Sequence, residues 1–147
     1  MRTLIVSATR QNVSKTSKTR LVESLNSFPT GDFELAMTTR NHDGLPKLYN
    51  TYINEQINNE FACLLFVHDD VYIDDLKCFK KIEEQFKNNI DVVGLAGATA
   101  AKVKVPALWH LMSEQKDWSG AVAHPHTDDT IHVTSFGPIP QRCLILD

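Results

Sequence analysis

The chain has 147 residues, which suits one domain, and 42% of them are hydrophobic and 22% charged. This composition is typical of a soluble globular domain and excludes a disordered, collagen-like or disulfide-rich chain. Fifteen Lys and Arg residues against 18 Asp and Glu residues give a net charge of −3. The overall charge therefore does not favour a nucleic acid or an anionic membrane as the main partner.

The three cysteines, Cys63, Cys78 and Cys143, are odd in number and show no C-x-x-C spacing. Cys63 lies in an apolar run and Cys78 in a predicted helix, so we expect both to be buried thiols in a reducing compartment. The first residues resemble a core strand rather than a signal peptide, and no apolar stretch reaches the roughly 20 residues that span a bilayer. We expect a cytoplasmic protein without a transmembrane segment; peripheral attachment to a membrane is left open.

Predicted strands and helices alternate over the first two thirds of the chain. Short apolar runs predict strands at 3–8, 33–38, 61–67 and 91–96. Helices are expected after a cap at Ser17 or Thr19, from Leu45, and after a cap at Asp74 or Asp75. This order is typical of a parallel α/β sheet with helices on both faces. The apolar helix positions are Leu21, Val22, Leu25 and Phe28; Leu48, Tyr49, Tyr52, Ile53 and Ile57; and Leu76, Phe79, Ile82 and Phe86.

The pattern weakens from Thr99 onward. The polar, His-rich segment 123–135 predicts a solvated loop, and one last strand is expected at 143–146. Imidazoles bind transition metals, so metal binding is a less favoured alternative for the loop. Its candidate ligands are His124, His126, His132, Asp128 and Asp129.

Ligands of open α/β sheets bind outside the carboxyl ends of the strands, which directs attention to LLFVHDDV at 64–71. Here a predicted buried strand delivers His68, Asp69 and Asp70 to its carboxyl end. Adjacent carboxylates suit a hard cation such as Mg²⁺ or Mn²⁺, which binds substrate phosphates at its open positions. The alternative is a polar turn in which Asp69 or Asp70 caps nearby backbone.

Three other segments at the same edge add candidates. Segment 9–19 carries Arg10, Lys15 and Lys18, which can meet phosphate or else belong to a solvated loop. The turn at 41–44, with Asn50 downstream, and GLAGAT at 94–99 allow close approach of backbone to a ligand. For GLAGAT, a tight exit from a strand is the alternative, because G-x-x-G alone is a weak signal.

Taken in order, four motifs resemble the nucleotide-binding half of family 2-like glycosyltransferases with a GT-A fold. They are VSATR at 6–10, N-x-x-G-L-x-x-x-Y-N at 41–50, LLFVHDDVYI at 64–73 and VVGLAG at 92–97. The likeness is strongest to a bacterial and phage glycosyltransferase-like group whose metal motif reads F-V-H-x-D-V. It covers about residues 3–98 and implies a Rossmann-like, three-layer α/β/α fold with a mostly parallel sheet.

The resemblance also implies roles for particular residues. Asp70, with Asp69 and His68, would bind Mg²⁺ or Mn²⁺, and His68 replaces the first carboxylate of the D-x-D motif. Asp147 follows a stretch that resembles the strand leading toward the acceptor site, so it is the candidate catalytic base. The residues expected to contact the donor nucleotide are Ser7, Ala8, Thr9, Arg10, Asn41, Asn50, His68 and Asp69.

The implied function is transfer of a sugar from a nucleotide-diphosphate sugar to a hydroxyl of a saccharide, lipid-linked or protein acceptor. Such enzymes usually continue past the equivalent of Asp147. We therefore expect a single GT-A-like domain over 1–147, with a nucleotide and metal half at 1–98 and the start of an acceptor-side region at 99–147. A further C-terminal region or a second copy of the chain would complete it.

Two alternatives to a transferase stay open. The first is a non-catalytic nucleotide-sugar-binding or assembly module with the same fold, which the His in the metal motif favours. The second, more remote, is a small metal-dependent hydrolase that uses the same carboxylates on a phosphate ester.

Overall fold

The computed structural model describes residues 2–29, 31–56, 61–100, 106–125, 130–139, 142–143 and 145–146. The chain divides into two compact units, the N-terminal unit (Met1–Asn88) and the C-terminal unit (Asn89–Asp147). Within the described residues, no helix is long and apolar enough to cross a membrane.

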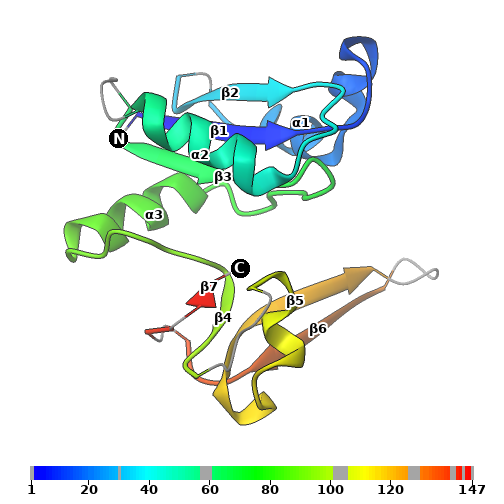
Figure 1. The fold of residues 1–147 in the computed structure, drawn as a ribbon. Coiled ribbons are helices and arrows are strands. Elements are labelled where there is room, and N and C mark those ends of the chain that lie inside the picture. The colour runs from blue at the N-terminus through cyan, green and yellow to red at the C-terminus, as the bar shows by residue number, and fades with distance from the viewer. Residues whose placement is uncertain are drawn as a thin grey trace. The chain divides into compact units, whose positions relative to one another are not determined.

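The N-terminal unit is a mixed α/β structure built on a three-stranded parallel sheet of order β2-β1-β3 (Figure 1). The pairing places Ile5 beside Leu35 on one side and beside Leu65 on the other. The sequence predicted β1 and β2 with their observed bounds, and β3 is shorter than the predicted 61–67. The strands are β1 (Thr3–Ala8), β2 (Phe33–Thr38) and β3 (Cys63–Phe66).

Helices occupy the connections between these strands, as parallel strands require. Thr19 caps α1, because its Oγ1 accepts a hydrogen bond from the Val22 N–H at 3.4 Å, which confirms one of the two predicted caps. The helical segments are the 3-10 helix η1 (Val13–Lys18) and the α-helices α1 (Arg20–Leu25), α2 (Leu45–Gln56) and α3 (Cys78–Lys87).

The predicted start of α3 is wrong. The N-cap is Lys77, and no side chain caps the helix. Asp75 instead accepts a hydrogen bond from the Lys77 N–H at 2.9 Å through Oδ1, in a turn that precedes the helix. Leu76 therefore lies outside the helical face and is 60% exposed, not buried as expected.

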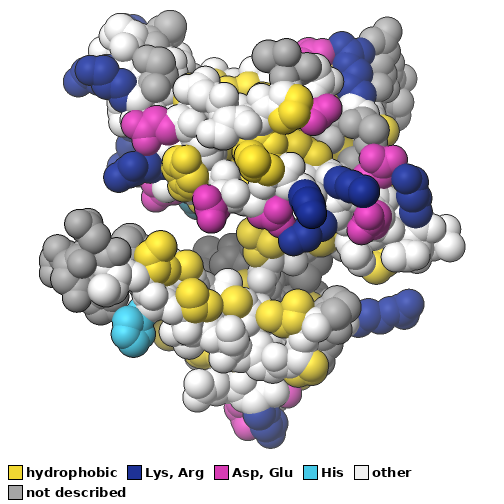
Figure 2. Space-filling model, turned by 180° about the vertical axis from the view of Figure 1, so that it is seen from behind, with side chains coloured by type: hydrophobic (Ala, Val, Ile, Leu, Met, Phe, Trp, Pro, Cys, Tyr) yellow, Lys and Arg dark blue, Asp and Glu magenta, His cyan; other side chains and the backbone are white. Residues whose placement is uncertain are grey.

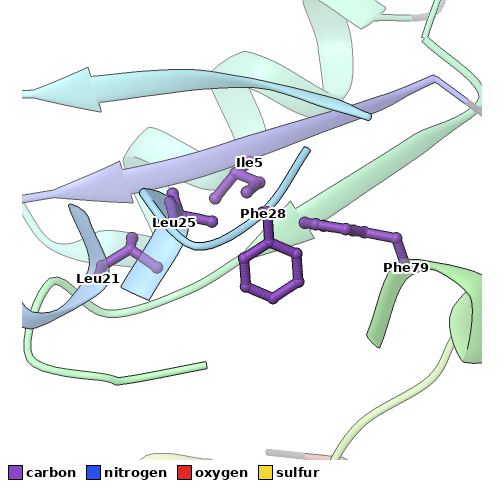
Figure 3. Close-up of a cluster of buried hydrophobic side chains, with 5 residues drawn as sticks. All are labelled: Ile5, Leu21, Leu25, Phe28 and Phe79. Atoms are coloured by element: carbon purple, nitrogen blue, oxygen red, sulfur yellow. The ribbon is translucent and has the colours of Figure 1, made fainter. Parts of the chain in front are cut away.

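One face of the parallel sheet carries the core of the N-terminal unit. Figure 3 shows Ile5 of β1 facing side chains from α1, from the turn after it and from α3. Phe28 meets Phe79 edge-on, with ring centroids 5.2 Å apart, and Phe79 stacks on Phe33 at 5.4 Å. These contacts pack α1 and α3 against the sheet. The buried cluster consists of Ile5, Leu21, Leu25, Phe28 and Phe79.

The opposite face of the same sheet is covered by α2 (Figure 1). Tyr49 of α2 stacks on Phe66 of β3 with ring centroids 4.3 Å apart. Phe66 lies beside Val6, which is fully buried. Coverage on both faces explains why β1 is apolar along most of its length instead of alternating with polar residues.

The C-terminal unit contains an antiparallel sheet of order β6-β5-β4-β7. Two 3-10 helices, η2 (Pro106–Leu111) and η3 (Gln115–Asp117), precede β5. The strands are β4 (Ala96–Ala98), β5 (Trp118–Pro125), β6 (Ile131–Phe136) and β7 (Ile145–Leu146).

Two predictions for this part of the chain are wrong. The strand expected at 91–96 is β4 at Ala96–Ala98, and it pairs antiparallel with β5 rather than joining the parallel sheet. Val92 and Leu95 are 70% and 84% exposed, so the apolar run is not a buried strand. A short apolar run does not specify its partner, and here β4 pairs with strands later in the chain.

The solvated loop expected at 123–135 is instead largely a β-hairpin of β5 and β6, in which Ala123 lies opposite Val133. Ile131 and Val133 alternate with polar residues, which is the two-residue period of a strand. Residues 126–129, between the two strands in the sequence, lie outside the described residues. The strand expected at 143–146 is the two-residue β7.

Specific contacts fix the register of the hairpin. The Trp118 ring meets Phe136 edge-on at 5.6 Å, and the Trp118 Nε1–H donates to Ser113 Oγ at 2.7 Å. The Ser119 hydroxyl donates to the Pro138 carbonyl at 2.7 Å. Further along the hairpin, Ile131 and Val133 are 67% and 61% exposed. Figure 2 shows hydrophobic side chains on the surface of this unit.

Candidate functional site

The carboxyl ends of β1, β2 and β3 lie along one edge of the sheet, because the three strands are parallel (Figure 1). We call this the carboxyl edge. It is where open α/β sheets bind ligands. All the predicted nucleotide and metal residues except Asn50 lie at the ends of these strands or in the segments that follow them: Ser7, Ala8, Thr9, Arg10, Asn41, His68, Asp69 and Asp70.

Thr9 joins the segments that follow β1 and β2. Its N–H donates to the Thr38 carbonyl at 2.8 Å, and its carbonyl accepts from the Asn41 N–H at 2.9 Å. Its hydroxyl accepts from the Gln11 N–H at 3.1 Å. Because Thr9 is almost fully buried, its hydroxyl stabilises the loop through this internal hydrogen bond.

Arg40 makes a second connection between these segments, and sequence reasoning missed it. Its N–H donates to the Gln11 carbonyl at 3.0 Å, and its Nε donates to Asn12 Oδ1 at 2.7 Å. Its backbone has a φ of +51°, a left-handed conformation that is uncommon outside glycine. The available signal was position, since Arg40 lies two residues beyond the predicted end of β2.

The segment after β3 is held by its backbone. The Val67 N–H extends the pairing with β1 by donating to the Val6 carbonyl at 3.1 Å. The Asp69 carbonyl then accepts from the Leu21 N–H, in the first turn of α1, at 3.2 Å. This bond places the start of α1, which directly follows segment 9–19, beside the HDD sequence at 68–70.

The side chains of His68 and Asp70 are exposed, and Asp69 is partly exposed. Within the described part of the chain, neither carboxylate forms a hydrogen bond or ion pair. The turn uses backbone carbonyls instead, as where His68 accepts from the Val71 N–H at 3.3 Å. The capping role that the sequence left open for Asp69 or Asp70 is therefore not observed with any described backbone group.

Two adjacent carboxylates on an exposed turn fit a hard divalent cation that takes its remaining ligands from water and substrate oxygens. Among the residues described, no group of three or more His, Cys, Asp or Glu side chains could hold a metal ion. A metal ion at Asp69 and Asp70 would therefore need further ligands from water or from a bound molecule.

Basic side chains lie on the segment between β1 and α1. Arg10, Lys15 and Lys18 are all exposed, and the two lysines are on η1. None of the three forms an ion pair with another described residue. Unpaired cations on a segment that starts and ends at the carboxyl edge are suited to phosphate oxygens.

Other predicted residues are not brought to this group. Asn50 is exposed on α2, and no described contact joins it to the carboxyl edge. The Asn41 amide donates to the Asp43 carbonyl at 2.9 Å, which closes its own turn. The Ser7 side chain is fully buried, so the strand positions it beneath the surface. Asp147 lies outside the described residues, as do His126, Asp128 and Asp129.

Several side chains of the N-terminal unit have shifted pKa values. Burial raises the pKa of the Cys63 thiol. Burial also raises the pKa of Tyr49. The pKa of Asp75 is lowered, first by its hydrogen bond with Lys81 and then by the Lys77 N–H. Asp75 is thus engaged in a local ion pair, unlike Asp69 and Asp70.

Comparisons of the chain with protein-family models, with curated proteins and with solved structures give no significant match.

Proposed function

We propose that the chain is a glycosyltransferase-like protein whose N-terminal unit binds a nucleotide-diphosphate sugar at the carboxyl edge. In this proposal the unit is the donor-binding part of a GT-A-like, three-layer α/β/α fold, and the sugar passes to an acceptor hydroxyl. The observation that carries the proposal is the hydrogen bond from the Leu21 N–H to the Asp69 carbonyl, because it places the end of the cationic segment 9–19 beside the exposed carboxylates at 69–70.

The two sets of charges have complementary tasks toward a nucleotide diphosphate. Arg10, Lys15 and Lys18 attract and orient the phosphate oxygens. Asp69 and Asp70 would hold Mg²⁺ or Mn²⁺, which when bound neutralises charge on the diphosphate leaving group. Carboxylates alone would repel a diphosphate, so the proposal requires both the cation and the basic segment.

Transfer also requires a base for the acceptor hydroxyl. An inverting reaction would use a carboxylate for this step. Asp147 stays the candidate on motif resemblance alone, and the acceptor could be a saccharide, a lipid-linked sugar or a protein. The donor site and the transfer step therefore need separate tests.

Calorimetric titration of the full chain with UDP and with GDP, each with and without Mn²⁺, tests the donor site. We expect binding that Mn²⁺ strengthens, and at least a tenfold loss of affinity in Asp70→Asn. Asp32→Asn is the matched control, because Asp32 is an exposed carboxylate just before β2, at the opposite edge of the same sheet. Absence of binding by either nucleotide, or equal affinity in the two variants, would contradict the proposal.

A second measurement separates the transferase from a non-catalytic binding module. Sugar release from a panel of UDP- and GDP-sugars, measured with Mn²⁺ present, is expected for the transferase and should disappear in Asp70→Asn. Nucleotide binding without sugar release or transfer across the panel would favour the binding or assembly module instead.

A further inference from the structure

The segments that follow β1 and β2 run side by side at the carboxyl edge, and Arg40 joins them (Figure 1). Its backbone N–H donates to the Gln11 carbonyl at 3.0 Å, and its Nε–H donates to Asn12 Oδ1 at 2.7 Å. The residue is therefore held at two points, through its backbone and through one nitrogen of its guanidinium. These two bonds determine which part of the guanidinium is left for another partner.

The far edge of the Arg40 guanidinium is unused. A guanidinium carries N–H donors on three nitrogens in a planar fork. The donor on Nε is bonded to Asn12, whereas those on Nη1 and Nη2 form no hydrogen bond or ion pair with any described residue. Because Arg40 is exposed, this edge can be reached from solvent. Two parallel N–H donors at a fixed spacing match two oxygens of one phosphate group.

Two local features are unfavourable in themselves and are present only with this arrangement of Arg40. Its φ of +51° lies in the left-handed region, which residues with a side chain rarely adopt. Asn12 is the N-cap of η1, where an asparagine oxygen often accepts a backbone N–H, yet its side chain makes no capping bond and accepts from Arg40 instead. Strained residues of this kind are concentrated at ligand-binding sites, where the strain serves to position a side chain.

The charge around this side chain also favours an anion. Segments 9–19 and 38–42 contain Lys and Arg residues but no Asp or Glu, although the whole chain has a net charge of −3. The next carboxylate along the chain, Asp43, is already paired with Lys47 at 3.0 Å. Arg10 in the neighbouring segment is exposed and has no ion-pair partner among the described residues. Like charges on adjacent segments repel one another, and a bound anion would relieve that repulsion.

We propose that Arg40, positioned by Asn12, binds a phosphate group through Nη1 and Nη2, and that this anion site binds without a metal ion. It differs in chemistry from the carboxylates of Asp69 and Asp70, which would act through a cation. In a complex with a nucleotide diphosphate, one phosphate of the diphosphate occupies the site; this identification of the ligand rests on the proposed function. Asn12 is a positioning residue, because it acts through Arg40.

Calorimetric titration of the full chain with inorganic pyrophosphate, at low ionic strength and with a metal chelator present, tests the site. We expect the wild-type chain to bind, and Arg40→Gly to lose about tenfold or more in affinity, because the charged fork is removed. Glycine tolerates the positive φ and keeps the backbone N–H, so this variant should unfold at the same or a higher urea concentration. A lower urea midpoint with unchanged pyrophosphate affinity would show that Arg40 has only a structural role and would overturn the proposal.

Two further variants separate the fork from its charge and from its position. Arg40→Lys keeps a positive charge but lacks the two-nitrogen edge, so it should bind about threefold or more weakly than the wild-type chain. Asn12→Ala removes the acceptor that fixes Nε and breaks no capping bond. It should weaken binding, but less than Arg40→Gly does.

Arg20→Gln is the matched control, because Arg20 is an exposed arginine of the same unit that is already paired with Glu23 at 3.3 Å. This variant should bind pyrophosphate as the wild-type chain does. Absence of pyrophosphate binding, equal affinity in the wild-type chain and Arg40→Gly, or equal losses in Arg20→Gln and Arg40→Gly would overturn the proposal.

Asp70→Asn distinguishes this proposal from the proposed function. Because pyrophosphate binding is measured without metal, Asp70→Asn should not weaken it. Binding of UDP with Mn²⁺ but no binding of metal-free pyrophosphate would refute the Arg40 site and leave the donor site standing. Pyrophosphate binding that depends on Arg40, without binding of UDP or GDP, would support the anion site and refute the donor site.

Discussion

The sheets of the two units are stabilised in different ways. Buried apolar side chains support the sheet of the N-terminal unit, whereas a few specific contacts align the strands of the C-terminal unit. In the first, Ile5, Leu21 and their neighbours form a continuous apolar cluster under the strands. In the second, Ala98 is the one buried hydrophobic residue among those whose side chains the structure describes, while Ile131 and Val133 stay exposed. Its strands are instead aligned by Gly137, by the Ser119 hydroxyl and by the Trp118–Phe136 contact.

This difference matters for the candidate sites. The carboxyl edge of the N-terminal unit is supported from below by the apolar cluster, so single surface changes there should leave the fold intact. The β5–β6 hairpin depends on a register held by a few close contacts, so a change at one of them should disturb the pairing of the two strands. Substitutions that affect one unit and spare the other test the distinction.

The largest effect is expected from Phe79→Ala, which removes the ring that α3 contributes to the cluster. Loss of a buried phenylalanine costs about 3–5 kcal/mol of unfolding free energy. Urea unfolding followed by circular dichroism measures the loss. Both tryptophans, Trp109 and Trp118, belong to the C-terminal unit, so their fluorescence reports that unit separately.

The matched change in the other unit is Ile131→Ala, which truncates an exposed side chain. It should alter the unfolding free energy by no more than about 0.5 kcal/mol. Comparable losses in Ile131→Ala and Phe79→Ala would mean that the hairpin has a core of its own, and the contrast between the units would fail.

Gly137→Ala should cause the next largest loss of unfolding free energy, and the loss should affect the C-terminal unit. The added Cβ would meet the Trp118 carbonyl, and the positive φ strains any L side chain. We expect a loss above about 2 kcal/mol, since backbone strain of this kind alone costs roughly 1–3 kcal/mol. The tryptophan fluorescence transition should move to lower urea.

Gly31→Ala is the control for that change. Gly31 also has a positive φ, but nothing lies within 4 Å of its added Cβ, so only strain is introduced. Its effect should be smaller and should leave the tryptophan transition in place. A smaller effect for Gly137→Ala than for Gly31→Ala would argue against the close fit at the hairpin turn.

Alkaline pH should lower the free energy of unfolding of the N-terminal unit, because the buried Cys63 thiol resists ionisation. Burial raises the pKa of this thiol in the folded chain, whereas an unfolded thiol ionises near about 8.5. The contribution to stability is therefore complete below that pH, and it is lost as the pH rises from there through the higher folded pKa. The loss is at most about 1.4 kcal/mol per pH unit for one group.

Unfolding free energies at pH 7 and pH 9.5 measure this dependence. Cys63→Ala should reduce the difference between the two values, although Cys78 and Tyr49, whose pKa values burial also raises, will keep part of it. Cys143→Ala serves as the control in the other unit. A pH dependence that Cys63→Ala leaves unchanged would contradict the assignment.

The smallest effect is expected from Ser7→Ala. The Ser7 hydroxyl is fully buried and has no hydrogen-bond partner among the described residues, so its removal sacrifices no described bond. The change should be neutral or stabilising by up to about 1 kcal/mol. Ser24→Ala is the contrast, because that buried hydroxyl donates to the Leu21 carbonyl at 2.7 Å. It should lose about 0.5–1.5 kcal/mol, and equal losses in the two would reveal a hidden partner for Ser7.

Local sequence determines the elements of the N-terminal unit well. The bounds of β1 and β2 and the Thr19 cap follow from β-branched apolar runs and from a side chain that can accept a backbone hydrogen bond. The carboxyl edge was also predictable, because parallel order places the strand ends together. What could not be predicted is the long-range pairing, such as β4 with β5, which depends on residues far apart in the chain.

Details of the site depend on the same kind of distant contact. The Arg40–Asn12 hydrogen bond requires a left-handed backbone at Arg40, which no local preference for arginine indicates. The pairing of β5 with β6 likewise forms in a segment whose polar composition predicted a loop. Leu76 lies outside the predicted apolar helix face because Asp75 forms a turn with Lys77 before the helix begins.

Backbone-amide NMR can test the proposed binding of a nucleotide diphosphate and its cation at the carboxyl edge. Addition of UDP with a trace of Mn²⁺ should broaden the amide signals of Arg10, Asp69 and Asp70. Signals of Thr3 and Phe33, about 17 Å away at the other end of the strands, should stay sharp. Broadening of Thr3 and Phe33 before Asp69 and Asp70, or no change at either edge, would contradict the account.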